Sequence, residues 1–427
     1  MERLCQLLQK KFPSLPKIKI QNVVMDSRKI TEGSLFFAIQ NGNQYVQEAL
    51  DKGASLVIAD RYSGNHEKVI KVENTILVMQ ELAEEYRRCL KTKMIAITGS
   101  NGKTTTKDII YAILSKTFQT KKTLGNYNNH IGLPFTILNL EEKDEFAVLE
   151  MGMSSFGEID LLGKIARPDY GIITNIGDSH LEFLKTRENV FKAKTELLPY
   201  LPKECFITSG DDVFLKKIPA IHVGYDERND YRIFGYQKKD RRSSFQLNDK
   251  QYEIPLEGKH NVMNAAMGIA IAEMIGMDSK TIQQNLLQIE LSPMRFERSE
   301  YQGTKYINDA YNASPISMGV ALDSLVETTA ECKIAVLGDM LELGEKEVTF
   351  HKDVIEKAIS CSLQAILLYG PRMKKALQEF SNIPNKVLHF EKKEEIKDYL
   401  KQFPRKTVLI KASRGMKLEE IIEREEK

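Results

Sequence analysis

Short apolar runs alternate with stretches of helical spacing along most of the chain, a pattern typical of α/β proteins. In the first ninety residues, the runs SLFFAI (34–39) and ASLVIAD (54–60) flank a helical stretch at 46–54. We therefore expect a small α/β domain over residues 1–90. It is too small to hold all the chemistry and fits a recognition role.

The middle of the chain predicts a second and larger domain, which we place at residues 91–292. It opens with the apolar strand MIAIT, a glycine-rich turn and a helix over 104–118, and the strands AVLEMG, YGIITNIG, ECFITSG and AIHVGY follow. Helical segments lie between several of these strands, so a mostly parallel sheet covered on both faces is predicted. Shorter alternating strands at 230–256 indicate an antiparallel flap, and a helix at 260–276 closes the domain.

The remaining residues, 293–427, repeat the alternation with the strands KIAVLGD, AILLYG, KVLHF and TVLIKAS, and we expect a last helix after them. This is the pattern of a second doubly wound, Rossmann-like unit. The predicted fold is therefore α/β with three domains.

Bulk composition narrows the class of protein. A chain of 427 residues with 42% hydrophobic and 28% charged residues fits a folded protein of two or three domains. The 61 basic and 59 acidic side chains are interspersed, which argues against a nucleic-acid partner. Five scattered cysteines fit reduced thiols, and no stretch approaches the roughly 18 apolar residues of a membrane span. We expect a cytoplasmic protein without membrane insertion.

The segment ITGSNGKTTT (97–106) lies between a predicted strand and a predicted helix, the context of a phosphate-binding loop. Its two glycines let backbone N–H groups converge on phosphate oxygens, Lys103 offers a charge to the β and γ phosphates, and Thr104 offers a hydroxyl to Mg²⁺. The candidate ATP contacts are Thr98, Gly99, Ser100, Asn101, Gly102, Lys103, Thr104 and Thr105. The plainer alternative is a glycine turn before an ordinary helix. The loop alone does not distinguish a kinase, an ATPase and a ligase.

Two further side chains are expected at the same sheet edge. Glu150 ends the strand AVLEMG and His180 follows YGIITNIG, so both are candidate metal ligands beside Mg-ATP. Taken singly, Glu150 could be a solvated rim residue and His180 a structural histidine. By pattern alone, Lys194 is an exposed helix lysine.

Read together and in order, these segments resemble the Mur ligase family. The resemblance rests on TGSNGKTTT, Glu150, NIGDSHLEFLKTRENVFKAKTEL, GKHNVMNAAMGIAIA, NDAYNASP and KASRGMKLE, and covers nearly the whole chain. It implies an N-terminal domain that binds a UDP-sugar, a central ATPase domain, and a C-terminal domain that closes over the nucleotide and brings the incoming amine. One departure is Ser314, which stands in DAYNASP where Asn is usual.

The resemblance also implies roles for individual residues. Thr104 and Glu150 would hold one Mg²⁺, while Glu150, His180 and a carbamylated Lys194 would hold a second. Nucleotide contacts would come from Asn261, Asn264, Arg295, Asp309, Tyr311 and Asn312. Substrate contacts would come from Ser27, Arg28, Asn128 and Asn129, with Lys411, Ser413 and Arg414 anchoring the carboxylate of the amine substrate. Without the resemblance, the segments around Ser27 and Lys411 read as solvated turns.

Within the family, NYNNHIGLP, DAYNASP and AVLGDMLELGEKE followed by His351 resemble the members that add D-alanyl-D-alanine to UDP-N-acetylmuramoyl-tripeptide. Such an enzyme would phosphorylate the tripeptide carboxylate with ATP and let the amine attack the acyl phosphate, in cytoplasmic peptidoglycan precursor synthesis, acting as a monomer. A third-residue-adding relative is disfavoured because its DNPR-type motif is absent. That relative, a polyglutamate-type ligase, a P-loop kinase or switch NTPase, and a non-catalytic binding module remain the alternatives.

Overall fold

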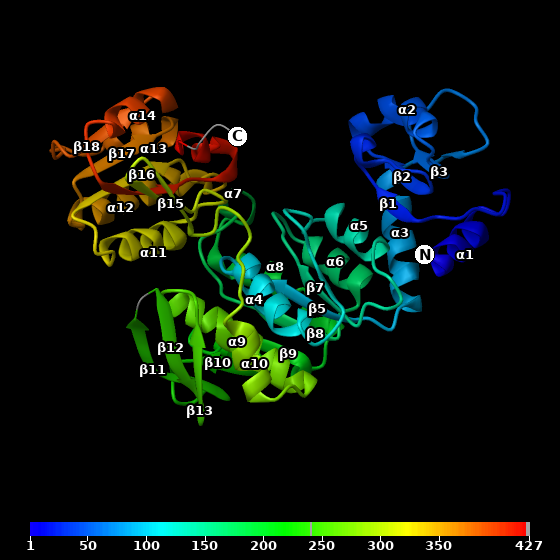
Figure 1. Cartoon of the computed structure of the whole chain (residues 1–427), viewed down its shortest axis with the longest axis horizontal. Coiled ribbons are helices and arrows are strands. Elements are labelled where there is room, and N and C mark those ends of the chain that lie inside the picture. Colours follow the sequence, from blue (N-terminus) through cyan, green and yellow to red (C-terminus); the bar gives the residue numbers. More distant parts are fainter. Residues whose placement is uncertain (240, 424–427) are drawn as a thin grey trace.

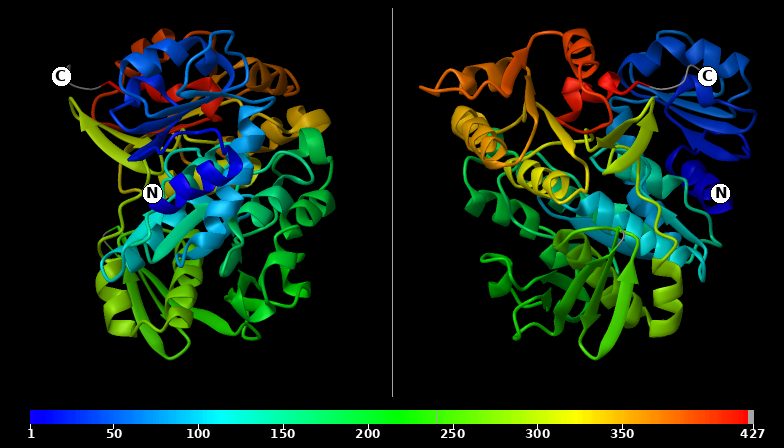
Figure 2. Two further views of the ribbon diagram at one scale, coloured as in Figure 1. Left: turned by 90° about the vertical axis from the view of Figure 1, so that its right-hand side faces the viewer. Right: turned by 60° about the vertical axis from the view of Figure 1, so that its left-hand side comes forward.

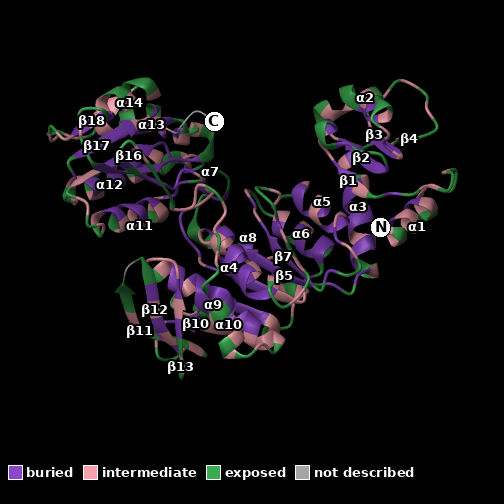
Figure 3. Cartoon of the chain, in the orientation of Figure 1, coloured by how far each residue is buried: buried purple, intermediate pink, exposed green. Residues whose placement is uncertain are grey.

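The structure, a computed structural model, describes residues 1–239 and 241–423 and is built on three separate β-sheets (Figure 1). The N-terminal and C-terminal sheets lie on the same side of the central sheet, as the further views show (Figure 2). Most parallel strands of the three sheets are buried, whereas the strands at 231–239 and 297–301 are mostly exposed (Figure 3). The predicted α/β architecture with mostly parallel sheets is confirmed.

The N-terminal sheet has four parallel strands in the order β1-β2-β3-β4. Phe36 and Phe37, neighbours on one strand, are both fully buried and belong to different hydrophobic clusters, so both faces are covered. Two strands of this sheet escaped prediction because each has only three residues. The elements are α1 (Glu2–Lys11), β1 (Asn22–Val24), η1 (Ser27–Lys29), β2 (Ser34–Ala38), η2 (Gln40–Tyr45), α2 (Val46–Asp51), β3 (Leu56–Ala59) and β4 (Val69–Lys71).

Helix α3 (Thr75–Cys89) connects the N-terminal sheet to the central unit. Asn74 caps its first turn by accepting hydrogen bonds from two backbone N–H groups. Farther along, the Tyr86 hydroxyl donates to the Leu140 carbonyl at 2.8 Å, and Arg87 donates to the Ala166 carbonyl at 2.7 Å and to Asp169 at 2.9 Å. The helix thus ends anchored to the central unit, next to the predicted domain boundary.

The central sheet has nine strands in the order β13-β12-β11-β10-β9-β8-β5-β7-β6. Neighbours are parallel from β11 to β6, and β11, β12 and β13 form the predicted antiparallel flap. The strands are β5 (Lys93–Thr98), β6 (Thr120–Lys122), β7 (Phe146–Glu150), β8 (Tyr170–Ile173), β9 (Phe206–Ser209), β10 (Ile221–Gly224), β11 (Tyr231–Lys239), β12 (Arg242–Leu247) and β13 (Lys250–Ile254).

Helices cover both faces of the central sheet, as predicted. Helices α4 and α9 contribute to the core on one face, and α5 and α6 to the core on the other, which also contains α3. The helices are α4 (Lys103–Ser115), α5 (Gly132–Leu138), α6 (Glu158–Ala166), α7 (Leu181–Leu184), α8 (Arg187–Thr195), α9 (Lys259–Ile275) and α10 (Ser279–Leu286). Short 3₁₀ turns are η3 (Leu198–Tyr200), η4 (Lys203–Cys205) and η5 (Leu215–Lys217).

The C-terminal sheet has the order β14-β15-β19-β16-β17-β18, parallel except for the β14–β15 hairpin. Its strands are β14 (Glu297–Tyr301), β15 (Thr304–Asn308), β16 (Cys332–Gly338), β17 (Ala365–Tyr369), β18 (Val387–Phe390) and β19 (Lys406–Lys411). Its helices are α11 (Pro315–Val326), α12 (Glu347–Ser360), α13 (Pro371–Leu377) and α14 (Lys393–Leu400), with a 3₁₀ turn η6 (Gly344–Lys346).

The helix predicted after the last strand is wrong for the described residues. Two 3₁₀ turns stand there, η7 (Arg414–Met416) and η8 (Leu418–Ile421), separated by Lys417 at φ 49°. A left-handed residue interrupts an α-helical ladder, so one helix cannot run through both turns. Within the described ranges, no helix is both long and apolar enough to cross a bilayer.

Candidate functional site

Two glycines give the turn between β5 and α4 its shape. Gly99 and Gly102 have φ values of 144° and 83°, which L side chains rarely adopt. A Cβ at Gly99 would lie 1.9 Å from Thr174 Oγ1, and one at Gly102 would lie 2.7 Å from Asn264 Oδ1. The neighbouring segments therefore pack against bare backbone, which leaves no space for a side chain at either position.

Lys103 begins α4 and folds over this turn. Its Nζ donates to the carbonyls of Gly99 at 2.7 Å and Ser100 at 3.4 Å. Burial lowers the pKa of the Lys103 amine, with nearby Glu150 opposing the shift. The N-terminus of a 13-residue helix and an adjacent ammonium make a ready anion site.

Arg295 links the C-terminal segment to the phosphate loop. One guanidinium nitrogen donates to Thr104 Oγ1 at 3.0 Å, and the group lies 4.2 Å from the centre of the Tyr311 ring. Arg295 Nε is buried without a hydrogen-bond partner among the described residues. Met294 and Phe296, on either side, have φ values of 61° and 51°, a strained backbone of the kind that clusters at functional sites.

Glu150 ends β7 and is only 2% exposed. Its Oε1 accepts a hydrogen bond from Asn128 Nδ2 at 2.8 Å. Its Oε2 is buried and has no hydrogen-bond donor in the described part of the chain, although Lys107 Nζ is 3.8 Å away. A buried carboxylate oxygen without a hydrogen bond suits a cation ligand.

His180 follows β8 in a left-handed conformation, φ 56°. Its Nδ1 is 2.6 Å from Oε2 of Glu342, a residue of the C-terminal unit. Burial lowers the pKa of the His180 imidazole, and the hydrogen bond to Glu342 opposes that shift.

Lys194 lies on α8 and is 1% exposed. Among the described residues, its amine has no hydrogen bond or carboxylate partner within the usual distances. Burial, reinforced by the Lys103 charge, holds the pKa of the Lys194 amine well below its usual value. Sequence pattern suggested an exposed helix lysine, and the structure contradicts that alternative.

A cleft of about 410 Å³ brings many of these side chains together at the junction of the central and C-terminal units. The predicted site residues that border it are Ser100, Asn101, Lys103, Asn128, Asn129, Glu150, His180, Arg295, Tyr311, Asn312, Ser413 and Arg414. A smaller cavity of about 50 Å³ adjoins it at Gly102, Lys103, Thr104 and Arg295.

Donors for a divalent cation are present, but in a mixed set. In the described ranges, no three His, Cys, Asp or Glu side chains gather into one potential metal site. The free Oε2 of Glu150 and the second ring nitrogen of His180 nevertheless fit a cation that takes its other ligands from hydroxyl, phosphate or modified-lysine oxygens. The predicted ligands therefore fit Mg²⁺ only as part of such a set.

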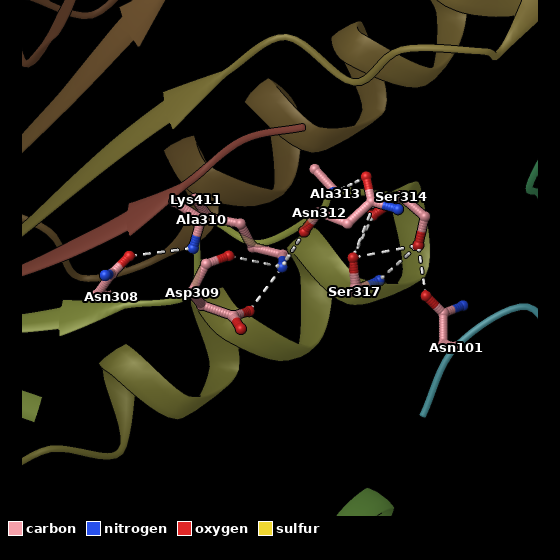
Figure 4. A network of polar contacts seen from close by, with 9 residues as sticks. All are labelled: Asn101, Asn308, Asp309, Ala310, Asn312, Ala313, Ser314, Ser317 and Lys411. Carbon is pink, nitrogen blue, oxygen red and sulfur yellow. Dashed lines mark hydrogen bonds and ion pairs between the residues drawn. The ribbon is translucent and has the colours of Figure 1, made fainter. Parts of the chain in front are cut away.

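The C-terminal edge of the site is a polar network (Figure 4). Ser314 caps α11 and donates to Asn101 Oδ1 of the phosphate loop at 2.8 Å, so the serine that replaces the usual Asn spans the two units. Lys411 Nζ contacts Asp309 Oδ2 at 2.6 Å and the Asn312 carbonyl at 2.9 Å.

Lys411 is therefore not a solvated turn residue. It is 1% exposed and Asp309 is 4% exposed, so the pair is an internal ion pair at the end of β19. Neither residue borders the cleft, whereas Ser413 and Arg414 do.

The other predicted residues lie on α9, beside the phosphate loop and in the N-terminal unit. Asn261 and Asn264 are buried on α9, Asn264 against the phosphate loop and Asn261 donating to the Glu257 carbonyl. Thr98 and Thr105 flank the loop, and Asn129 Oδ1 accepts from the backbone N–H groups of Ile131 and Gly132, where α5 begins.

Ser27 and Arg28 lie in the N-terminal unit, outside the cleft. Arg28 is exposed and pairs with Asp26 at 2.8 Å, and Ser27 is buried with its carbonyl accepting from Lys52. Their predicted contact with a UDP-sugar stays a prediction.

Sequence reasoning missed Glu342, although the segment AVLGDMLELGEKE was singled out. That segment holds several acidic residues, and the sequence does not tell which of them contacts His180. The contact of Glu342 follows from the path of the loop across the domain junction. Lys107, buried beside Glu150, was missed because one lysine in a helix carries no signal of its own.

Comparison with known proteins agrees with this geometry. The Mur ligase middle domain matches residues 97–272, and the Mur ligase glutamate ligase domain matches residues 294–414. Together with the full-length relatives described next, these matches show that the chain belongs to the Mur ligase family, as its motifs predicted.

The relatives point to one branch of that family. The UDP-N-acetylmuramoyl-tripeptide--D-alanyl-D-alanine ligase of Bacillus subtilis is 38% identical, over 96% of this chain and 94% of the relative. MurF of Acinetobacter baumannii superposes with a TM-score of 0.87 at 27% identity, covering 98% of this chain and 97% of that one. MurF ligase of Thermotoga maritima, solved in complex with ADP, superposes with a TM-score of 0.82 at 29% identity, covering 94% of this chain and 96% of that one.

Proposed function

We propose that the chain is an ATP-dependent, Mg²⁺-requiring ligase that joins D-alanyl-D-alanine to UDP-N-acetylmuramoyl-tripeptide through an acyl phosphate. The named relatives and the ADP complex of one of them support the substrates and the nucleotide. A solved UDP-N-acetylmuramoyl-L-alanyl-D-glutamate--2,6-diaminopimelate ligase shares only the fold with this chain, at 19% identity, and so does FPGS of L. casei, at 14% identity. The third-residue-adding and polyglutamate alternatives are therefore less well supported.

One observation carries the proposal: a single cleft holds the phosphate loop and reaches residues of the C-terminal unit. A carboxylate becomes an acylating agent only when its oxygen is made a leaving group. In this cleft a substrate carboxylate oxygen would attack the γ-phosphorus and release ADP. The amine would then attack the acyl carbon, lose a proton and release inorganic phosphate.

Lys103 would exchange its two carbonyl contacts for phosphate oxygens as ATP binds, and so offset negative charge where it accumulates. Arg295 is placed for the same task, because it already contacts Thr104 and has an unused Nε. Both cations lie at the junction, so docking of the C-terminal unit would complete the phosphate site and exclude water from the acyl phosphate.

Thr104, Glu150, His180 and Lys194 are the proposed metal-holding residues. When bound, Mg²⁺ would neutralise charge on the phosphates and the attacking carboxylate. Lys194 would contribute as a carbamate. A buried amine with a lowered pKa is more often neutral, and a neutral amine can add CO₂.

We further propose that residues 1–90 recognise the UDP-sugar, 91–292 bind ATP and 293–427 bring the dipeptide. Arg414 and Ser413 border the cleft and would meet the dipeptide carboxylate. Lys411, already held by Asp309, would support that edge from below. A cytoplasmic location and a monomeric state remain predictions.

The substrate proposal is tested by measuring phosphate release. We expect release to require ATP, Mg²⁺, UDP-muramoyl-tripeptide and D-alanyl-D-alanine together, with single amino acids inactive as acceptors. Phosphate release that does not depend on an amine would indicate an NTPase, and ADP formation without phosphate release would indicate a kinase. Release with single amino acids would point to another Mur-type ligase.

Lys103→Ala tests the proposed role of Lys103 in the phosphate loop. Loss of the ammonium should reduce ligation by at least about 10²–10³-fold, the size of effect seen when one transition-state charge partner is removed. The matched control is Lys116→Ala, an exposed lysine just after the same helix. Near-normal turnover in Lys103→Ala, with Lys116→Ala also normal, would refute the role of Lys103.

A further inference from the structure

The loop between β16 and α12 crosses from the C-terminal unit to the central unit. The Glu182 backbone N–H donates to the Glu342 carbonyl at 3.1 Å. A Cβ at Gly344, whose φ is 64°, would lie 3.0 Å from Glu182 Cα, so the two backbones nearly touch. The loop is therefore seated on the turn that carries His180.

This loop is held in place from its own side as well. Met340 N–H donates to His351 Nε2 at 2.9 Å, and Leu341 N–H donates to Ser413 Oγ at 2.9 Å. These bonds precede Glu342, which adopts φ 63°, a left-handed conformation that is costly for glutamate. Such a conformation persists only where its surroundings enforce it.

The contact that Glu342 makes selects one form of the His180 ring. A carboxylate can only accept a hydrogen bond, so the proton of a neutral His180 must reside on Nδ1, 2.6 Å from Glu342 Oε2. Nε2 then keeps its lone pair. His180 and Glu342 both border the cleft that contains Glu150 and Lys103.

We propose that Glu342 is a positioning residue that fixes the His180 tautomer and ring orientation, leaving Nε2 free for a divalent cation. Because Glu342 belongs to the C-terminal unit, the cation site is complete only when that unit is docked. This inference rests on the proposed role of His180 as a metal ligand. Carboxylate-to-histidine hydrogen bonds of this kind orient metal ligands in many proteins.

The test measures cation binding directly, with Mn²⁺ as the probe and ADP present, from the free-Mn²⁺ EPR signal. Glu342→Ala should weaken Mn²⁺ binding about ten- to a hundredfold, the usual effect of removing such a partner. Glu342→Gln retains an acceptor oxygen and should lose less. The matched control, Glu345→Ala, removes an exposed acid of the same loop and should bind Mn²⁺ like the wild type.

A second readout reports the ring itself. ¹⁵N spectra of histidine-labelled protein should show His180 protonated at Nδ1 in the wild type and a mixture of tautomers in Glu342→Ala. Unchanged Mn²⁺ affinity and an unchanged tautomer in Glu342→Ala would overturn the inference.

A third variant separates this inference from the metal role on which it depends. If His180→Ala weakens Mn²⁺ binding while Glu342→Ala does not, only the positioning role fails. If neither variant changes Mn²⁺ binding, His180 is not a ligand and its proposed metal role fails together with the positioning role of Glu342, whereas wild-type ligation of D-alanyl-D-alanine would still stand.

Discussion

The central unit and the C-terminal unit each bury a lysine, Lys194 in the first and Lys411 in the second. Both side chains are 1% exposed. Lys411 meets the carboxylate of Asp309 at 2.6 Å, whereas Lys194 has no carboxylate partner in the described ranges. Burial lowers the pKa of both amines, and only for Lys411 does a neighbouring anion oppose the shift.

The difference indicates which lysine is structural. A buried ion pair is costly to break from one side, because the remaining charge loses its partner. A buried amine without an anion gains nothing for stability and is open to chemical modification. We therefore propose a structural role for Lys411 and a chemical role for Lys194, although both lysines are equally buried.

The largest expected effect comes from breaking the pair. Lys411→Met should destabilise the protein by about 3–5 kcal/mol, because Asp309 would be left charged and buried. The double variant Lys411→Met with Asp309→Asn should recover much of that loss, since no buried charge remains. Unfolding followed by calorimetry measures both. A loss of dipeptide affinity in Lys411→Met with full stability would instead support the anchoring role predicted from sequence.

Lys194→Ala should affect activity far more than stability, reducing ligation by about 10²–10³-fold. Lys192→Ala, on the exposed side of the same helix, is the control and should keep normal activity. Labelling with ¹³C-bicarbonate should give a carbamate NMR signal in the wild type that is absent from Lys194→Ala. If removal of CO₂ leaves activity unchanged and no carbamate signal appears, the modification is excluded and Lys194 acts as a bare amine.

The smallest effect concerns His351, a third buried base. Its Nδ1 donates to the Glu347 carbonyl at 2.6 Å and its Nε2 accepts from Met340, so both nitrogens are used by the neutral ring. Burial lowers the pKa of His351 below its ordinary value near 6.5. The folded state then binds fewer protons than the unfolded state, so this contribution to stability is present above about pH 6.5.

As the pH falls below 6.5, stability should decrease by up to about 1.4 kcal/mol per pH unit for this group. Burial also lowers the pKa values of His180 and His260. The contribution of His351 is therefore the difference between the wild type and a His351 variant in how steeply the unfolding free energy changes with pH. The acid slope of the unfolding free energy should be shallower in His351→Leu than in the wild type. An identical slope in His351→Leu would mean that the imidazole is not held neutral.

Several parts of the site were predictable because their signals are local. Glycines at the loop, an apolar strand before it and a helical pattern after it follow from turn chemistry and side-chain periodicity within ten or fifteen residues. Glu150 and His180 were placed at one edge because parallel strands share the direction of their carboxyl ends.

Roles that depend on contacts with residues far away in the sequence could not be inferred from local patterns. The segment KASRG looks like a basic turn, and nothing in it shows that Lys411 ends a buried strand opposite Asp309. Arg414 and Ser413, three residues or fewer away, do reach the cleft. Lys194 resembled an exposed helix lysine, since burial depends on what packs over the helix.

By itself, the sequence determined the alternation of strands and helices, the phosphate loop and the family, because those depend on contacts between near neighbours in the chain. Only the tertiary structure decided which charges are paired. Glu342 reaches His180 across 162 residues and Lys411 reaches Asp309 across 102. Such partners are selected by how separate sheets pack, and that packing is the sum of many weak contacts that no single motif records.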